Sequence, residues 1–225
     1  MNRAIFVIGD VHGCYHTLVD LVAKLPKNSR LIFVGDLCDR GLYTKEVIDF
    51  IIENNYEVIL GNHDDYMVSH ILESIDNEDR YIRWKDEDYM GGAQTLLSYK
   101  NDIKHIEKHL EFLESLPRYI EIGNYFITHG FALPYYKNRD KQSAHIGLLK
   151  NRIDDKEDWG DDWEKNWQDY DVINIFGHTD YKEVEIGKNY YGIDTGCVYG
   201  GKLSAIELDK MNIISVALNK KDIST

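Results

Sequence analysis

Two kinds of apolar pattern alternate along the first quarter of the chain. Continuous or nearly continuous apolar runs, typical of buried strands, cover residues 4–8, 31–34 and 57–60. Between the runs, apolar residues recur at helical spacing over residues 15–25, where Pro26 ends the pattern, and over residues 47–52, with Thr44 as a candidate N-cap. The order strand, helix, strand, helix, strand predicts a parallel sheet with right-handed crossovers.

The remaining pattern predicts more helices and a second group of strands. Residues 64–116 favour helix, with a break at Gly91-Gly92, and residues 119–122 and 125–128 form a hairpin pattern. After a polar loop to about residue 141, Trp159, Trp163 and Trp167 recur every fourth residue, which predicts the buried face of a helix with solvated acidic neighbours. Further strands are predicted at residues 172–176 and, as antiparallel strands, at residues 190–193, 203–208 and 213–218.

Composition indicates a soluble globular chain rather than a disordered or membrane-spanning one. The 225 residues are 43% hydrophobic and 29% charged, which suits one sizeable core. A net charge of −13 argues against binding nucleic-acid polymers or anionic membranes, but it permits a small anionic substrate held by metal ions. The 3 cysteines cannot all pair, and no targeting segment is visible, so we expect a cytoplasmic protein. The oligomeric state stays open.

Polar side chains follow the predicted strands, where open α/β sheets place their ligands. Carboxylate, amide and imidazole groups stand at these strand ends: Asp10, His12, Asp36, Asn62, His129 and His178. Without a thiolate among them, this donor set suits manganese, iron or zinc. It is too large for one open catalytic ion, but it fits two ions roughly 3.5–4 Å apart that share a carboxylate. Asp36 is the natural bridge, with Asp10 and His12 on one ion and the other three residues on the second.

Two ions at that spacing would activate a bridging water and clamp a phosphoryl group. The neighbouring residues fit the same chemistry. Arg40 offers a planar fork for phosphate oxygens. His63 can protonate the leaving oxygen, while Asp39 can hold that imidazole in the required tautomer.

These clusters resemble the motifs of a known enzyme family. Residues 9–13 (GDVHG), 35–41 (GDLCDRG) and 61–64 (GNHD) are similar to the three motifs of the phosphoprotein-phosphatase (PPP) branch of the calcineurin-like metallophosphoesterases. Residues 128–130 (THG) and 177–179 (GHT) match its later histidine motifs, and the compact bacterial and phage members, such as lambda-phage phosphatase, look most similar.

The resemblance implies a fold and further site residues. It implies an α/β sandwich of two central mixed β-sheets flanked by helices, and a single metallophosphoesterase catalytic domain over residues 1–225. It also implies a second phosphate-binding arginine, for which Arg152 is the best match and Arg139 the alternative.

The implied activity is that of a serine/threonine protein phosphatase with broader phosphomonoesterase activity. Its cofactors would be two divalent ions, with manganese favoured and iron or zinc as alternatives. A symmetrical bis(5'-nucleosyl)-tetraphosphatase is the second hypothesis, because Asp64 stands where protein phosphatases usually have glutamate, although such relatives often lack the counterpart of Asp39. A non-catalytic binding scaffold is a remote third, because scaffolds lose ligands and this chain retains a candidate for each.

Overall fold

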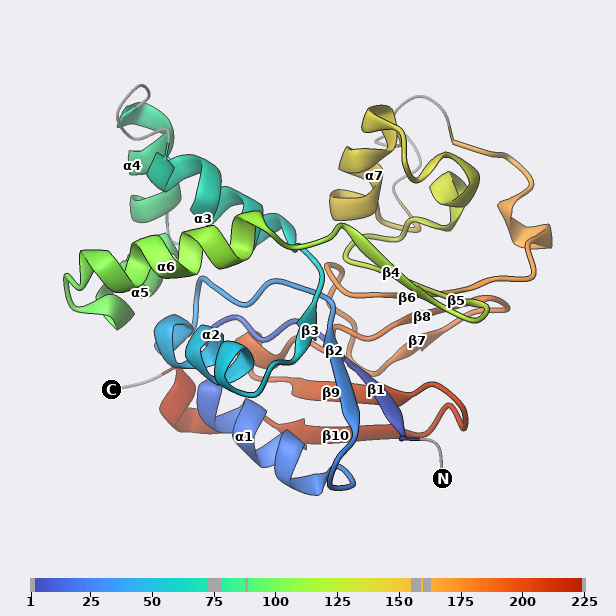
Figure 1. Cartoon of the computed structure of the whole chain (residues 1–225), viewed down its shortest axis with the longest axis horizontal. Coiled ribbons are helices and arrows are strands. Elements are labelled where there is room, and N and C mark those ends of the chain that lie inside the picture. The colour runs from blue at the N-terminus through green and yellow to red at the C-terminus, as the bar shows by residue number, and fades with distance from the viewer. Residues whose placement is uncertain (1–2, 73–77, 88, 155–158, 160–162, 224–225) are drawn as a thin grey trace.

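Two five-stranded mixed sheets lie at the centre of the computed structural model, which describes residues 3–72, 78–87, 89–154, 159 and 163–223 (Figure 1). Across the first sheet, the order is β10 (Ile213–Ala217), β9 (Lys202–Glu207), β1 (Ile5–Ile8), β2 (Arg30–Phe33) and β3 (Glu57–Val58). Across the second, it is β4 (Tyr119–Ile122), β5 (Tyr125–Thr128), β6 (Ile173–Phe176), β8 (Tyr190–Gly192) and β7 (Glu185–Ile186). The predicted sandwich of two mixed sheets is therefore confirmed.

Helices connect and flank these sheets. The α-helices are α1 (Tyr15–Lys24), α2 (Thr44–Glu53), α3 (Asn62–Leu72), α4 (Glu78–Asp86), α5 (Gly92–Tyr99), α6 (Ile103–Glu114) and α7 (His145–Lys150). Short 3₁₀ helices cover Leu133–Asn138, Gln142–Ala144, Trp167–Asp169, Cys197–Tyr199 and Lys220–Asp222. In the part of the chain that the structure describes, no helix combines the length and apolarity needed to cross a bilayer.

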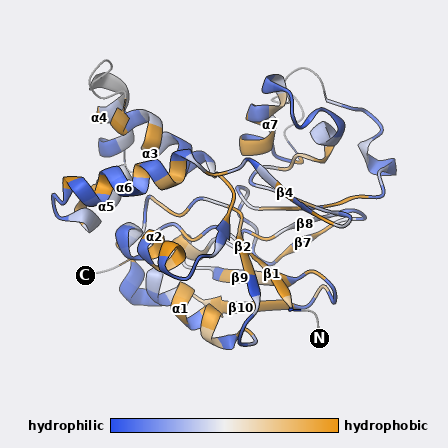
Figure 2. Cartoon of the chain, in the orientation of Figure 1, coloured by the Kyte–Doolittle hydropathy of each residue, from blue (hydrophilic) through white to orange (hydrophobic). Residues whose placement is uncertain are grey.

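The alternation of side chains along each strand builds two apolar layers. Val7 on β1 and Ile32 on β2 point between the sheets, where they pack in one cluster with Ile127 and Ile175 of the second sheet. Neighbouring residues such as Phe6, Ile8 and Phe33 point the other way and pack beneath α1 and α2. Apolar residues accordingly colour β1 and β10, and they alternate with polar ones along α1 (Figure 2). The all-apolar runs thus reflect strands that are buried on both faces.

The predicted β-α-β-α-β order is confirmed, because β1 pairs in parallel with β2 and β2 with β3. The antiparallel prediction holds for β9 with β10. It was wrong for residues 190–193, because β8 pairs in parallel with β6 and is antiparallel only to the short β7. Segments at the end of the chain therefore complete both sheets.

Two helix predictions also need correction. Thr44 is the first residue of α2 rather than its N-cap, and its hydroxyl lies 3.2 Å from the hydroxyl of Thr95. The tryptophans are buried or half-buried, but Trp167 lies in a 3₁₀ helix, and the three rings pack in a cluster with Phe131 and Phe176 instead of lining an α-helix. Most of their acidic neighbours, residues 155, 157, 158, 161 and 162, lie outside the described residues.

Candidate active site

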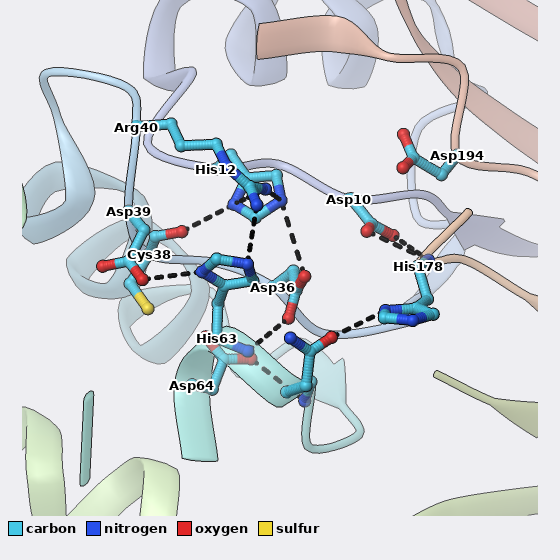
Figure 3. A network of polar contacts seen from close by, with 12 residues as sticks. Asp10, His12, Asp36, Cys38, Asp39, Arg40, His63, Asp64, His178 and Asp194 are labelled. Carbon is cyan, nitrogen blue, oxygen red and sulfur yellow. Dashed lines mark hydrogen bonds and ion pairs between the residues drawn. The ribbon is translucent and has the colours of Figure 1, made fainter. Parts of the chain in front are cut away.

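All six candidate ligands lie where parallel strands of the two sheets end. Asp10 and His12 follow β1, Asp36 follows β2, and Asn62 opens α3 just after β3. From the second sheet, His129 follows β5 and His178 follows β6. Figure 3 shows Asp36 in the middle of the group, with His12, His63 and His178 around it. The edge predicted from the sequence therefore brings these residues together.

Several site residues have left-handed backbone conformations that side chains disfavour. The φ angles are +44° at His12, +50° at Asp36, +71° at Asp39, +69° at Arg40 and +65° at His178. Such conformations cost roughly 1–3 kcal/mol each and persist where the surroundings enforce them. The strand-end loops are thus strained into shapes that aim their side chains at one centre.

Asp64 holds two of these loops together. Its fully buried carboxylate accepts hydrogen bonds from the backbone N–H groups of Leu37 (2.9 Å) and Gly61 (3.1 Å). Burial, together with the nearby Asp36, raises the pKa of Asp64 to about 6. The loops touch so closely that a Cβ at Gly61 would collide with the backbone nitrogen of Asp36. Because Asp64 faces backbone rather than the cavity, it is not in a position to select a substrate directly.

Asp36 lies between two imidazoles. Its Oδ2 is 3.5 Å from Nε2 of His12, and its Oδ1 is 3.3 Å from Nε2 of His129. Donor atoms of Asp10, Asp36 and His129 all lie within 4.8 Å of one another. This placement fits the predicted role of Asp36 as the bridge between two ions.

Backbone carbonyls fix the orientation of both imidazoles. Nδ1 of His12 is 2.7 Å from the carbonyl oxygen of Cys38, and Nδ1 of His129 is 2.7 Å from that of Val34. When each Nδ1–H donates to its carbonyl, Nε2 is left facing the Asp36 carboxylate. Partners of this kind typically orient metal-binding histidines.

The buried carboxylates among these candidate ligands need a positively charged partner. Asp10 and Asp36 are 3% and 2% exposed. Burial, reinforced by Asp194, raises the pKa of Asp10 well above its usual range. Burial would also raise the pKa of Asp36, but surrounding imidazoles, His129 foremost, hold it well below its usual range. In turn, the carboxylates Asp36 and Asp10 outweigh burial and raise the pKa of His129 to about 10. Buried carboxylates require such a positive partner, and divalent ions fit this donor set.

Asn62 gathers the remaining candidate ligands on one side of Asp36. Its side-chain oxygen lies 2.9 Å from Nε2 of His129 and 2.7 Å from Nδ1 of His178. Burial, with His129 nearby, lowers the pKa of His178 to about 3, so this imidazole is neutral and can act as a ligand. An amide oxygen and two imidazoles thus converge beside the bridging carboxylate.

His63 and Asp39 form a tightly held pair beside the ligands. Nδ1 of His63 lies 2.7 Å from Oδ2 of Asp39, which is fully buried. Asp39 also accepts hydrogen bonds from Nε1–H of Trp84 (3.0 Å) and from the hydroxyl of Thr95 (2.9 Å). Neither Trp84 of α4 nor Thr95 of α5 was given a role from the sequence, although Thr95 follows the Gly91-Gly92 break in a stretch that resembles the family. They keep the carboxylate fixed, so that it can orient the imidazole.

Arg40 spans the two histidines on the open side of the group. Its Nη2 donates to Nε2 of His63 at 2.7 Å, and its Nη1 contacts Nε2 of His12 (Figure 3). The guanidinium carbon also lies 5.3 Å from the ring centre of Tyr199. Because arginine only donates, His63 must accept through Nε2 and donate its Nδ1–H to Asp39.

A cavity of about 330 Å³ opens over this group. Arg152 lines it, whereas Arg139 lies elsewhere and pairs with Glu121 at 3.1 Å. Sequence reasoning assigned no role to several other residues of the wall: Tyr66, Tyr89, Lys150, Asp194 and Tyr199. Asp194 follows β8, so the rule that polar residues gather at strand ends could have found it once β8 was known to be parallel.

The fold and the candidate metal ligands gathered at the strand ends are those of a metallophosphoesterase. The chain belongs to the calcineurin-like phosphoesterase family, whose profile matches residues 4–179. It is accordingly a hydrolase of phosphoester bonds, and the donor groups around Asp36 are placed to hold the divalent metal centre of that family.

One curated relative matches almost the whole chain. The chain is 30% identical over 238 residues to an asymmetrical bis(5'-nucleosyl)-tetraphosphatase named PrpE from Anoxybacillus flavithermus, over 93% of this chain and 92% of the relative. This relative is a tetraphosphatase, which corrects the expected similarity to lambda-phage phosphatase.

Solved structures support the fold. The crystal structure of a candidate diadenosine tetraphosphatase superposes with a TM-score of 0.70 at 23% identity, over 96% of this chain and 93% of the other. A Saccharomyces cerevisiae serine/threonine phosphatase similar to human PP5 gives 0.60 at 17% identity, over 96% and 80%. At these identities the likeness concerns the fold alone.

Proposed function

We propose that this protein is a bis(5'-nucleosyl)-tetraphosphatase and that residues 1–225 form its single catalytic domain. The observation that carries the proposal is the wall of the active-site cavity. Arg40, Arg152 and Lys150 place cationic groups along it, although the chain as a whole has a net charge of −13. A single phosphoryl group needs only part of that charge, whereas a chain of four phosphates can use all of it.

Aromatic rings at the same wall suit the nucleoside ends. Tyr89 and Tyr199 are each 63% exposed, and Tyr66 lies under the ammonium of Lys150, with 4.6 Å between the ammonium and the ring centre. Exposed rings of this kind provide stacking surfaces for bases. The name of the PrpE relative supports the same substrate class and favours asymmetrical cleavage, to a nucleoside triphosphate and a monophosphate.

The residues of the chain divide the work of hydrolysis. The proposed metal ligands are Asp10, His12, Asp36, Asn62, His129 and His178, and we favour manganese as the metal. When bound, the two ions would supply Lewis-acid activation of water and of the scissile phosphoryl group.

Arg40 and Arg152 would bind the phosphate oxygens. Once Arg40 turns from His63 to the phosphate, Nε2 of His63 would be free to carry a proton and pass it to the leaving oxygen, while Asp39 holds Nδ1–H. Nε2 of His12 cannot accept from Arg40 and bind an ion with the same lone pair. Loading with metal would therefore free one nitrogen of the guanidinium for the phosphate.

One observation favours a second candidate, a phosphomonoesterase that acts on phosphoproteins. The buried Asp39 holds His63 with the help of Trp84 and Thr95, so the site is built to deliver a proton. Serine and threonine alkoxides are strong bases that need such a proton, whereas nucleotides are weak bases that need it less.

Turnover of diadenosine tetraphosphate and of a phosphopeptide set, on one sample with measured metal content, tests the proposal. We expect kcat/KM for the dinucleotide to exceed that for every peptide by at least about tenfold, a difference of about 1.4 kcal/mol. ATP plus AMP as products would indicate asymmetrical cleavage, and two ADP the symmetrical kind. A preference for phosphopeptides would refute the proposal in favour of the second candidate.

A further inference from the structure

A second cluster of metal-binding side chains lies outside the active site, between α2 and α6. Asp49 belongs to α2, and His105 and His109 are one turn apart on α6. Both imidazoles aim Nε2 at the same carboxylate oxygen, Oδ1 of Asp49, at 2.7 Å from His105 and 3.1 Å from His109. The three donor atoms lie within 4.8 Å of one another.

The outer nitrogens of both rings have partners of the kind that orient metal ligands. Nδ1 of His105 faces Oδ2 of Asp102 at 3.6 Å, and Nδ1 of His109 lies 2.8 Å from the hydroxyl of Tyr99. Burial lowers the pKa of His109 to about 4, so its imidazole is neutral near pH 7 and has a lone pair available. The spacing of the two histidines, four residues apart, places both on one face of the helix.

A neutral His105 cannot donate to both of the carboxylates that flank its ring, Asp49 and Asp102. If a neutral His105 donated Nε2–H to Asp49, its Nδ1 lone pair would face the Asp102 carboxylate, and two acceptors would confront each other. With Nδ1–H turned toward Asp102, the Nε2 lone pair instead faces Asp49. Lys45 takes the other oxygen of Asp49, with 2.9 Å from Nζ to Oδ2, and leaves Oδ1 to the two histidines.

We propose that Asp49, His105 and His109 bind one divalent ion, and that Zn²⁺ is the best match. Two imidazoles and a carboxylate are ordinary ligands for zinc, which takes three protein ligands where a fourth position stays open. The ion would fasten α6 to α2. Because Thr44 of α2 also contacts Thr95, the residue of α5 that holds Asp39, the site would brace the helices behind the catalytic pair.

Zinc stoichiometry tests the site without relying on catalysis. The 225-residue protein is stripped with a chelator, saturated with Zn²⁺, freed of excess ion and analysed for metal per chain. We expect Asp49→Asn and His105→Gln to bind one zinc fewer than the wild type. Asp49→Asn retains an oxygen that accepts hydrogen bonds, so it separates metal binding from the structural role of the cluster. His145→Gln is the matched control, because His145 belongs to none of the donor groups found in the described residues.

A second readout is the zinc-induced rise in the thermal midpoint. The rise should be smaller in Asp49→Asn and His105→Gln than in the wild type, and unchanged in His145→Gln. Equal zinc content in the wild type and in both cluster variants would overturn the proposal. An equal loss of zinc in His145→Gln would also overturn the proposal, because the loss would then be unrelated to this cluster. Either result leaves the proposed dinucleotide activity untouched, since that activity is measured separately.

Discussion

Replacing His63 with asparagine tests the predicted route of the proton. The substitution removes the imidazole that donates Nδ1–H to Asp39 at 2.7 Å and accepts from Arg40 at 2.7 Å. Asp39 would keep the hydrogen bonds from Trp84 and Thr95, at 3.0 and 2.9 Å. Because two hydrogen-bond donors to Asp39 remain, we expect the fold to be retained and the catalytic rate to fall.

The expected loss follows from the role of a general acid. Proton transfer by a positioned side chain contributes about 10²–10⁴ in rate, which corresponds to about 2.7–5.5 kcal/mol of barrier. The loss should reach the upper end for an alkyl phosphate, whose leaving alkoxide is a strong base. It should be much smaller for p-nitrophenyl phosphate, because nitrophenolate departs without a proton.

The assay is therefore kcat/KM of the wild type and of His63→Asn over a series of leaving groups, with metal content measured in parallel. His145→Gln serves as the control for the loss of a histidine outside the site. An equal loss for every leaving group would refute the general-acid role and leave His63 as a positioning residue. Depleted metal would instead show that His63 is a ligand, which is a real alternative because it lies within 4.8 Å of donor atoms of His12 and Asp36.

Three further predictions concern substrate binding, stability and pH. Arg40→Ala should lower kcat/KM by about 10–100-fold, as expected for the loss of charge-assisted hydrogen bonds to phosphate. Its metal content should stay at the wild-type level, and depletion would indicate a structural role. Asp222→Ala should lower the free energy of unfolding by about 2 kcal/mol in urea titrations, because this buried carboxylate accepts from the hydroxyl and N–H of Thr17 at the start of α1. The exposed Asp209→Ala is its control, and equal losses would contradict the capping role. Because burial lowers the pKa of His109 to about 4 from 6.5, the unfolded chain binds a proton that the folded chain excludes. The metal-free protein should therefore lose up to about 3 kcal/mol as the pH falls from about 6.5 to 4, and a flat profile would contradict this.

The first sheet could be predicted because local pattern and topology agree there. Apolar runs such as residues 31–34 must be buried on both faces, and a helix between two such runs makes them parallel. The partner of β8 could not be predicted, because a three-residue strand carries no mark of the strand beside it. The helix predicted from the tryptophan spacing was wrong, because aromatic rings four residues apart can also meet as a cluster around Phe131.

The position of the site could be predicted, but the distant residues that hold its side chains and the neighbouring helices in place could not. Asp36 and Asn62 directly follow buried strands, so the edge of the sheet determines where they lie. Trp84 reaches Asp39 from 45 residues away, and Asp222 reaches Thr17 across 205. Contacts at such separations depend on how the helices pack, and periodicity within a segment does not encode them.

The proposed catalytic pair and the cationic residues of the cavity wall are expected to favour different properties of a substrate. In the proposed mechanism, His63 and its buried partner Asp39 should matter most when the leaving group is a strong base, as an alkoxide is. Lys150 and Arg152 should matter most when the substrate carries several phosphates, whatever its leaving group. A loss of His63 should therefore widen the rate differences between leaving groups, while a loss of Lys150 should reduce the rate difference between dinucleotide and phosphomonoester. The two effects change the relative rates of different pairs of substrates. Relative rates measured on one set of esters therefore separate protonation of the leaving oxygen from selection of the substrate by its number of phosphates.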